Sequence, residues 1–261
     1  MAKFCSLYSS SSGNSTYIGT SAGGILIDVG VSAKKTVDAL KNIDVDPSEI
    51  SGIFITHEHS DHINGVRVFA SKYNIPVYAT EGTLDGMSDY GVFKSRVNAY
   101  IVPESGMESS GIFIRPFKTS HDSRESCGYS LVTPDGKRIA IATDTGIVTD
   151  DMDKAVCGCD LVLLESNHDI RMLKMGPYPF SLKQRILSDR GHLNNDDSAE
   201  FAKKLVGSGT TRLVLGHLSK ENNIPSLAYE TAKAAIAEIG AEENTDYMLT
   251  VAGDLNAPIC F

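Results

Sequence analysis

The chain has 261 residues, of which 24 are Lys or Arg and 33 are Asp or Glu, so its formal net charge is −9. Hydrophobic residues make up 41% and charged residues 22%, a globular composition that argues against disorder and, at this length, favours a single domain over residues 1–261. The acidic balance disfavours a protein that grips nucleic acid by bulk charge, although a local basic groove or bound metal can still supply positive charge.

Hydrophobic periodicity predicts the elements of secondary structure in chain order. Strands are predicted at 15–19, 25–28, 52–56, 76–79, 98–102, 111–117, 128–133, 138–143, 161–165, 211–215, 247–251 and 257–261. Helices are predicted at 32–42, 62–73, 180–188, 196–206 and 226–239. Ser32 and Asn195 stand where helix N-caps belong. Two strands end alike in Asp-x-Gly, at 25–30 and 139–146, which indicates two related half-units.

The apolar runs and the cysteines indicate the cellular compartment in which the protein works. The apolar runs are short, and none approaches the ~20 residues that span a bilayer. The first residues lack the apolar stretch of a secretory signal. The five Cys are scattered, which is not the pattern of a disulfide framework. We therefore expect a cytoplasmic protein with reduced thiols and no membrane partner.

Three of the seven histidines fall in one short stretch, Thr56-His-Glu-His-Ser-Asp-His62, directly after a predicted strand. Alternation along an extended chain points His57 and His59 to the same side, and Asp61 and His62 follow on the turn into the next helix. Imidazole nitrogens and carboxylate oxygens at this density are ligands that suit a borderline divalent cation. Three unrelated surface histidines are the alternative, but packing gives no reason to cluster titratable groups at a strand end.

This His-x-His-x-Asp-His turn resembles the signature of the metallo-β-lactamase superfamily, and the resemblance extends over residues 4–261. His121 matches the third-motif ligand of that superfamily, Asp144 its bridging carboxylate and His217 its last ligand. Alone, either histidine would be read as an ordinary core or surface residue, and Asp144 as a strand-end turn. The resemblance implies an α/β fold, the four-layered αβ/βα metallo-β-lactamase sandwich, with the site at one edge of the sheets.

The resemblance also implies two divalent metal ions, Zn²⁺ or Mn²⁺ with Fe²⁺ as a further option. One ion would take His57, His59 and His121, the other Asp61, His62 and His217, with Asp144 between them. Two cations that share a water lower its pKa and generate hydroxide at neutral pH. Asp61 would also be catalytic, orienting that water or accepting its proton. Asp28, at the end of a strand, would orient a ligand histidine or, alternatively, cap a turn.

Two features bear on the substrate. The bridging position is Asp144 and not Cys, which argues against the usual lactam-cleaving enzymes of the superfamily. His192, ahead of the last ligand, resembles an additional histidine of the phosphodiesterase branch, which gives a hydrogen bond or proton to the scissile phosphate and leaving oxygen. Thioesterases of the glyoxalase II kind lack that histidine. The alternative for His192 is a residue that merely flanks a helix.

A basic stretch runs over residues 171–190, with five basic side chains against the single acid Asp189. Tyr178 and Phe180 are interleaved, and basic plus aromatic side chains beside a metal site suit a phosphate backbone with stacked bases. A solvated helix face with core aromatics is the alternative.

The loop 9–15, which contains Ser12 and Asn14, is a further candidate for binding substrate. Its hydroxyls and backbone N–H groups would cradle a phosphate, or the loop is a plain hairpin turn. Segments 164–169, 175–179, 182–185 and 191–195 resemble the YycJ/WalJ group of the superfamily, whose members are bacterial cytoplasmic proteins assigned as 5′-to-3′ DNA exonucleases. By that similarity His168 and Glu165 line the substrate side, with a structural role for His168 as the alternative.

These resemblances imply a metal-dependent hydrolase acting on phosphodiester bonds, with nucleic acid, DNA before RNA, as substrate. The implied reaction is attack by metal-bridging hydroxide, with His192 assisting the leaving group as a catalytic residue. Two alternatives stay open: a hydrolase of small phosphodiesters or thioesters, and a non-catalytic metal-binding module. The sequence leaves metal identity, exonuclease polarity and oligomeric state open.

Overall fold

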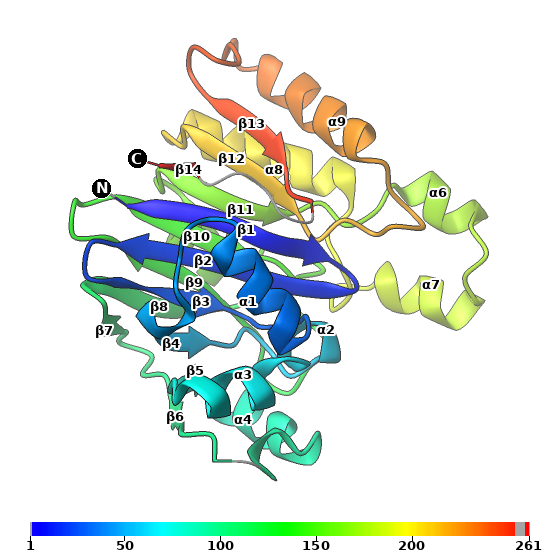
Figure 1. Cartoon of the computed structure of the whole chain (residues 1–261). Coiled ribbons are helices and arrows are strands. Elements are labelled where there is room, and N and C mark those ends of the chain that lie inside the picture. The colour runs from blue at the N-terminus through cyan, green and yellow to red at the C-terminus, as the bar shows by residue number, and fades with distance from the viewer. Residues whose placement is uncertain (1, 95, 254–258, 261) are drawn as a thin grey trace.

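The structure, a computed structural model, describes residues 2–94, 96–253 and 259–260. Within these residues two sheets of seven strands lie face to face, and helices cover the outside of each sheet (Figure 1). The predicted fold class, an α/β protein with the four-layered αβ/βα arrangement, is therefore confirmed. None of the helices in the described part of the chain has the length and apolar character needed to cross a bilayer.

The elements of the two sheets alternate with the helices along the chain. The first sheet contains β1 (Lys3–Ser10), β2 (Gly13–Thr20), β3 (Gly23–Ile27), β4 (Ile50–Phe54), β5 (Val77–Ala79), β6 (Ala99–Ile101) and β14 (Ile259–Cys260). The second contains β7 (Met107–Ser109), β8 (Ile112–Lys118), β9 (Cys127–Val132), β10 (Arg138–Ala142), β11 (Leu161–Glu165), β12 (Arg212–Gly216) and β13 (Met248–Val251). The helices are α1 (Ala33–Lys41), α2 (Ser60–Ile63), α3 (Val66–Tyr73), α4 (Glu81–Asp89), α5 (Asp150–Val156), α6 (Ile170–Met175), α7 (Phe180–Ile186), α8 (Asn195–Gly207) and α9 (Pro225–Ala237), with 3₁₀ turns η1 (Pro47–Glu49) and η2 (Val92–Lys94).

Strand order places the two halves of the chain in different sheets. The order is β14-β1-β2-β3-β4-β5-β6 in the first sheet and β13-β12-β11-β10-β9-β8-β7 in the second. Strands β3, β4 and β5 are parallel to one another, as are β10, β11 and β12. Parallel strands end at the same edge of a sheet, so the segments after them gather there.

Three hydrophobic clusters hold the layers together. Between the sheets, buried side chains such as Phe4, Ile25 and Tyr129 come from both of them. A second cluster packs α1, α3 and α4 on the outer face of the first sheet, and a third packs α5, α8 and α9 on the second. Strands buried on both faces explain the near-continuous apolar runs in the sequence. Because the middle cluster draws on both halves of the chain, we propose that the protein is one domain.

Most predicted strands agree with the structure to within two residues, but β1 and β7 are absent from the predicted set. The Ser-rich sequence of β1 hides a strand that pairs with β2 in a hairpin, whose turn lies at residues 11–12. The predicted strand 257–261 falls mostly outside the described residues. The part that is described, β14, pairs with β1.

The helix prediction 62–73 is wrong in one respect, because the chain forms two helices, α2 and α3, separated at Gly65. The Gly65 N–H donates to the Val29 carbonyl over 2.9 Å, and a Cβ at this position would lie 2.1 Å from the Val31 carbonyl oxygen. Tertiary packing against the segment after β3 therefore interrupts a helical pattern. Helices α4, α5 and α6 are also absent from the predicted set.

The predicted N-cap of α8 is also wrong by one residue. The Asn194 side chain accepts hydrogen bonds from the backbone N–H groups of Asp196 and Asp197 and is the cap. Asn195 is buried instead, where its side chain accepts from Ser166 Oγ over 2.7 Å and donates to Asn223 Oδ1 over 2.9 Å. Ser32 does cap α1, as predicted.

Candidate metal centre

The site lies where strands of both sheets end. Asp28 directly follows β3, Asp144 lies two residues beyond β10, and His217 directly follows β12. All three have left-handed backbone conformations, with φ of 62°, 58° and 55°. Such a conformation costs a non-glycine residue free energy and persists where the surroundings impose it, as at binding and catalytic sites. The Asp-x-Gly likeness seen in the sequence thus corresponds to a shared backbone turn at two strand ends.

The first group of ligand atoms comes from the turn after β4 and from the loop after β8. Donor atoms of His57, His59 and His121 all lie within 4.8 Å of one another. His59, the N-cap residue of α2, places its Nδ1 3.2 Å from His121 Nε2. Imidazole nitrogens this close to one another could serve as ligands of one ion.

A second group lies beside the first. Asp61, His62 and His217 also offer atoms within 4.8 Å of one another, and Asp61 Oδ2 is 3.6 Å from the Nε2 atoms of both histidines. Asp144 stands between the two groups. Its oxygens lie 3.3 Å from His62 Nε2, 3.5 Å from His217 Nε2 and 3.8 Å from His121 Nε2. The structure therefore brings all seven predicted ligands into one cluster, the His–Asp cluster.

Oxygen atoms behind the cluster orient three of its histidines. The Nδ1 atom of His62 donates to Asp28 Oδ2 over 2.8 Å, that of His217 to Glu165 Oε1 over 2.9 Å, and that of His121 to the Gly191 carbonyl over 3.0 Å. Each contact leaves Nε2 facing the cluster. A metal ligand histidine usually donates its other N–H in this way, and the contact of Asp28 with His62 is compatible with the orienting role that the sequence predicts for it.

Several buried polar atoms of the cluster lack a hydrogen-bond partner among the described residues. They are His57 Nε2, His217 Nε2 and Asp144 Oδ2. Buried polar atoms are otherwise almost always paired, because an unpaired one costs free energy. Nitrogen and oxygen atoms aimed at one small volume are satisfied together by a divalent cation. The residues present therefore fit divalent metal binding.

Burial and neighbouring charges set the protonation of these groups. Burial lowers the pKa of His57 well below its usual value and that of His121 to about 4, which keeps both in the neutral form that binds cations. Burial also disfavours the charged form of His62, but Asp144, Asp28 and Asp61 outweigh it and raise its pKa to about 9. The carboxylates of the cluster therefore favour a positive charge beside them. A bound cation would supply that charge in place of a proton on His62.

His192 lies beside the cluster, at the start of the segment leading into α8. Its Nδ1 donates to Glu165 Oε1 over 2.7 Å and is 3.8 Å from Asp144 Oδ1. Its side chain is 14% exposed, whereas those of His62 and His217 are at most 2% exposed. With Nδ1 committed to Glu165, Nε2 is the nitrogen that can meet a substrate.

Glu165 holds a position that reasoning from the sequence missed. It is fully buried, and its Oε1 atom accepts from both His192 and His217. The sequence placed Glu165 on the substrate side, but its burial behind the two histidines makes it a residue that orients them. A signal was present, because Glu165 ends the apolar strand β11 just as Asp28 and Asp144 follow theirs.

The three predicted substrate-binding residues occupy different environments. Asn14 lies at the cluster, with Nδ2 3.0 Å from His62 Nε2 and 3.4 Å from Asp61 Oδ2. Ser12 is exposed on the β1–β2 turn, where its Oγ accepts from Lys220 Nζ over 2.9 Å. His168 is 1% exposed, and neither ring nitrogen has a hydrogen-bond partner among the described residues. Burial lowers its pKa to about 4. Its burial favours the structural alternative over direct contact with substrate.

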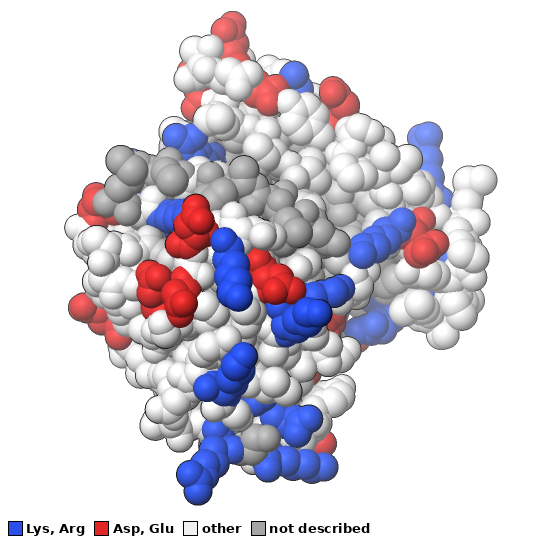
Figure 2. Space-filling model, viewed as in Figure 1, with Lys and Arg blue, Asp and Glu red and all other residues white. Residues whose placement is uncertain are grey.

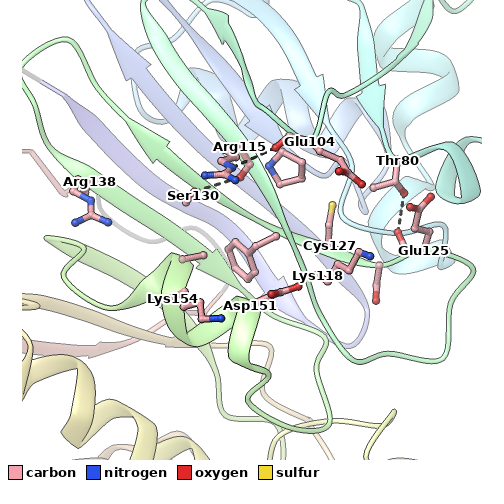
Figure 3. A pocket seen from close by; sticks show the side chains of 14 residues that line it. Thr80, Glu104, Arg115, Lys118, Glu125, Cys127, Ser130, Arg138, Asp151 and Lys154 are labelled. Atoms are coloured by element: carbon pink, nitrogen blue, oxygen red, sulfur yellow. Dashed lines mark hydrogen bonds between the residues drawn. The ribbon is translucent and has the colours of Figure 1, made fainter.

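A separate cavity of about 570 Å³ lies on the outer face of the second sheet beside α5 (Figure 3). Its lining includes Arg115, Lys118 and Lys154, together with the acids Glu104 and Asp151. None of the residues of the His–Asp cluster lines it. Its mixed charges give no converging set of ligand atoms, so we place the chemistry at the cluster.

The family model of the beta-lactamase superfamily domain matches residues 24–218, which hold every residue of the His–Asp cluster. The chain belongs to this superfamily.

Two relatives are similar over most of their length. Exodeoxyribonuclease WalJ of Streptococcus pneumoniae is 41% identical over 249 residues, covering 94% of this chain and 92% of the relative. Exodeoxyribonuclease YycJ of Bacillus anthracis is 38% identical over 238 residues, covering 91% of this chain and 90% of the relative. The resemblance to the YycJ/WalJ group is thereby confirmed.

Solved structures with low identity share the fold. The metallo-beta-lactamase fold protein YhfI of Bacillus subtilis aligns with a TM-score of 0.73 at 14% identity, covering 99% of this chain and 98% of that one. Zn²⁺-bound PqqB of Methylobacterium extorquens aligns with a TM-score of 0.72 at 17% identity, covering 99% of this chain and all of that one. At these identities the likeness concerns the architecture alone.

Proposed function

We propose that this protein is a metal-dependent exonuclease that hydrolyses phosphodiester bonds of DNA. The observation that carries the proposal is the pairing of the two ligand groups through Asp144, with His192 beside them. Two cation positions and a separate proton donor are groups that accelerate phosphodiester hydrolysis. The names of the two similar relatives support DNA as the substrate.

We assign His57, His59 and His121 to one divalent ion, and Asp61, His62 and His217 to a second, with Asp144 serving both. The ions, Zn²⁺ or Mn²⁺ with Fe²⁺ as a further option, supply Lewis acidity toward water and a phosphodiester. The protein contributes the geometry, because Asp28, Glu165 and the Gly191 carbonyl fix the histidine rings before any ion arrives.

Two residues of the chain would accept and donate the protons of the reaction. Burial by itself would raise the pKa of Asp61, but the positive charge of His62 outweighs burial and holds that pKa below its usual value, so this carboxylate is ionised and could orient the attacking water or accept its proton. His192 has its Nδ1 held by Glu165, so its Nε2 is free to donate a proton to the leaving oxygen. Asn14 Nδ2 lies 3.4 Å from Asp61 Oδ2 and would donate to a phosphate oxygen or to that carboxylate.

The test combines metal counting with a choice of substrates. The purified protein is stripped with a chelator, reloaded with Zn²⁺ or Mn²⁺, and given end-labelled duplex DNA, RNA, bis(p-nitrophenyl) phosphate and a glutathione thioester. We expect two ions per chain and release of nucleotides from DNA. Asp144→Asn should lose metal and activity, and Asp151→Asn, an exposed carboxylate on α5, is the matched control. Cleavage of the thioester alone would overturn the proposal, as would metal loading without hydrolysis of any substrate.

A further inference from the structure

Helices α6 and α7 form an arm that stands out from the body of the molecule. They lie between β11 and α8, and Figure 1 shows them at the edge of the structure, away from the faces of both sheets. The arm begins and ends at the site, because Glu165 precedes it and His192 follows it. The arm therefore projects from the two segments that hold Glu165 and His192.

The tip of the arm exposes large apolar side chains. Met175, at the end of α6, is 88% exposed, and Phe180, at the start of α7, is 77% exposed. No other large hydrophobic side chain in the described part of the chain is exposed to this extent. Soluble proteins tolerate single exposed apolar residues, but two at the tip of an arm that is joined to a candidate active site indicate a contact with a partner.

The tip is rigid as well as apolar. Pro177 and Pro179 restrict the backbone of the turn between the two helices. Lys183 Nζ donates to the carbonyls of Lys174 over 2.8 Å and Gly176 over 2.7 Å, which ties α7 back to the end of α6. A side chain presented on a fixed support loses little entropy when it binds.

The arm carries positive charge in an acidic protein. Residues 170–190 contain five basic side chains and one acidic side chain, whereas the whole chain has a net charge of −9. Arg171 and Lys174 are exposed and have no carboxylate partner among the described residues. Figure 2 shows Lys and Arg side chains beside an uncharged tip in this region, together with acidic side chains. Free cations flanking an apolar tip are complementary to a polyanion that also offers apolar faces, which is the chemistry of nucleic acid.

The base of the arm is fixed to the cluster. Arg185 forms an ion pair with Asp122, the neighbour of the predicted ligand His121, and its Nη2 donates to Asp122 Oδ1 over 2.9 Å. Arg190 Nη2 donates to the His121 carbonyl over 3.1 Å. From Arg185 to Phe180 the helix rises ~7.5 Å, since each residue adds about 1.5 Å. The tip of the arm therefore lies farther from Asp122 than the base of α7 does.

We infer, on the basis of the proposed function, that this arm binds the end of the DNA substrate. Phe180 and Met175 pack against bases beyond the cleaved bond, and Arg171 and Lys174 contact the backbone phosphates. A second copy of the chain is a weaker candidate for the occupant, because two side chains fall far short of the ~1,200–2,000 Å² that a stable interface buries.

The experiment compares hydrolysis of DNA with hydrolysis of bis(p-nitrophenyl) phosphate, which is too small to span the cluster and the tip. Phe180→Ala should lower the ratio of the two kcat/KM values by about 5- to 150-fold, the range expected when one base no longer stacks on an aromatic ring. The matched control is Phe113→Ala, since Phe113 is 42% exposed at the start of β8, away from His121. The control should keep the wild-type ratio.

Salt dependence tests the charges separately. DNA affinity is measured over a range of salt concentrations, and the logarithm of affinity is plotted against the logarithm of salt concentration. Arg171→Gln combined with Lys174→Gln should make the slope of this plot less steep by about 0.7–0.9 for each phosphate that the protein no longer neutralises. Lys41→Gln combined with Lys72→Gln is the control, because both residues are exposed in the last turns of α1 and α3. Helices that follow parallel strands run back from the site, so these charges lie far from it.

The outcomes separate this inference from the proposed function. If the wild-type protein hydrolyses bis(p-nitrophenyl) phosphate but not DNA, the proposed function fails. If it hydrolyses DNA and Phe180→Ala behaves like Phe113→Ala, the inference about the arm is overturned and the proposed function stands. If Phe180→Ala changes only the oligomeric state measured by light scattering, the occupant is a second copy and the inference is also overturned.

Discussion

Replacing Glu165 by Gln tests how the protein orients its histidines. Glu165 is fully buried, and its two carboxylate oxygens accept hydrogen bonds from two side chains and two backbone groups. Its Oε1 accepts from His192 Nδ1 over 2.7 Å and from His217 Nδ1 over 2.9 Å. Its Oε2 accepts from the backbone N–H groups of Thr145 over 2.9 Å and Leu193 over 3.3 Å. Burial by itself would raise the pKa of Glu165. The charges and hydrogen bonds of His192 and His217 outweigh burial, so the pKa lies below its usual value and the carboxylate remains ionised.

Gln has nearly the same shape as Glu but offers only one acceptor oxygen. Whichever way the new amide faces, two of the donors around it are left without an acceptor. A buried donor left unpaired costs about 1–3 kcal/mol, so the variant should be destabilised by about 2–6 kcal/mol. For a chain of this size that corresponds to a fall in Tm of roughly 5–20 °C. Where the amide faces the histidines, the carboxylate oxygen that orients their rings is also missing.

The assay uses three measurements on Glu165→Gln and on the control Asp151→Asn. Thermal unfolding of the chelator-treated protein reports the cost of the unpaired donors. Metal affinity, measured by competition with a fluorescent chelator, should fall by about 10- to 100-fold, as for other residues that orient metal ligands. The kcat/KM for DNA should fall at least as far. Wild-type metal affinity and activity in Glu165→Gln would refute the orienting role, even if the protein became less stable.

Three further predictions follow from the same geometry. His192→Ala should keep the full metal content, because no predicted ligand is removed, and should lower kcat by ~10²–10⁴-fold, the usual contribution of a general acid. Metal analysis and steady-state kinetics measure these two quantities. Loss of metal would make His192 a ligand. Asp28→Asn should weaken metal binding by about 10- to 100-fold, because the Nδ1 atom of His62 loses its charged acceptor at 2.8 Å. Equilibrium dialysis measures the metal affinity, and an unchanged affinity would contradict the prediction. Gly30→Ala should destabilise the protein by at least about 1–3 kcal/mol, since the new Cβ would lie 1.6 Å from the Asp61 carbonyl oxygen. Urea unfolding checks it against Gly207→Ala, where the nearest atom is 3.6 Å from the new Cβ, and equal stabilities of the two variants would refute it.

Local sequence patterns predicted much of the fold. The alternating and apolar runs located β2–β6 and β8–β13 because strands buried on one or both faces need apolar residues at short range. Short elements at the edges of the sheets were not predicted. One of them is β7, whose three residues are too few to show a hydrophobic period. α5 escaped although Thr149 caps it, because acidic residues fill its first turn and hide the apolar positions Met152 and Val156.

The turn at residues 57–62 shows what could be read of the site directly. His57, His59 and His62 are close in sequence, so their clustering did not depend on the fold. His121, Asp144 and His217 could be added only through resemblance to a family, because no local pattern brings residues so far apart together. Their placement beside the same turn is a result of the two sheets packing face to face.

The sequence by itself determined the chemistry that is available: the metal-binding types of side chain, their order along the chain and the reversal of charge at residues 171–190. Tertiary structure alone decided which groups share a space. It placed Glu165 behind two histidines, buried His168, interrupted a helical pattern at Gly65 and exposed Phe180 at the tip of an arm. The physical reason is that composition and periodicity act over a few residues, whereas burial and hydrogen-bond partners are set by contacts between segments distant in the chain.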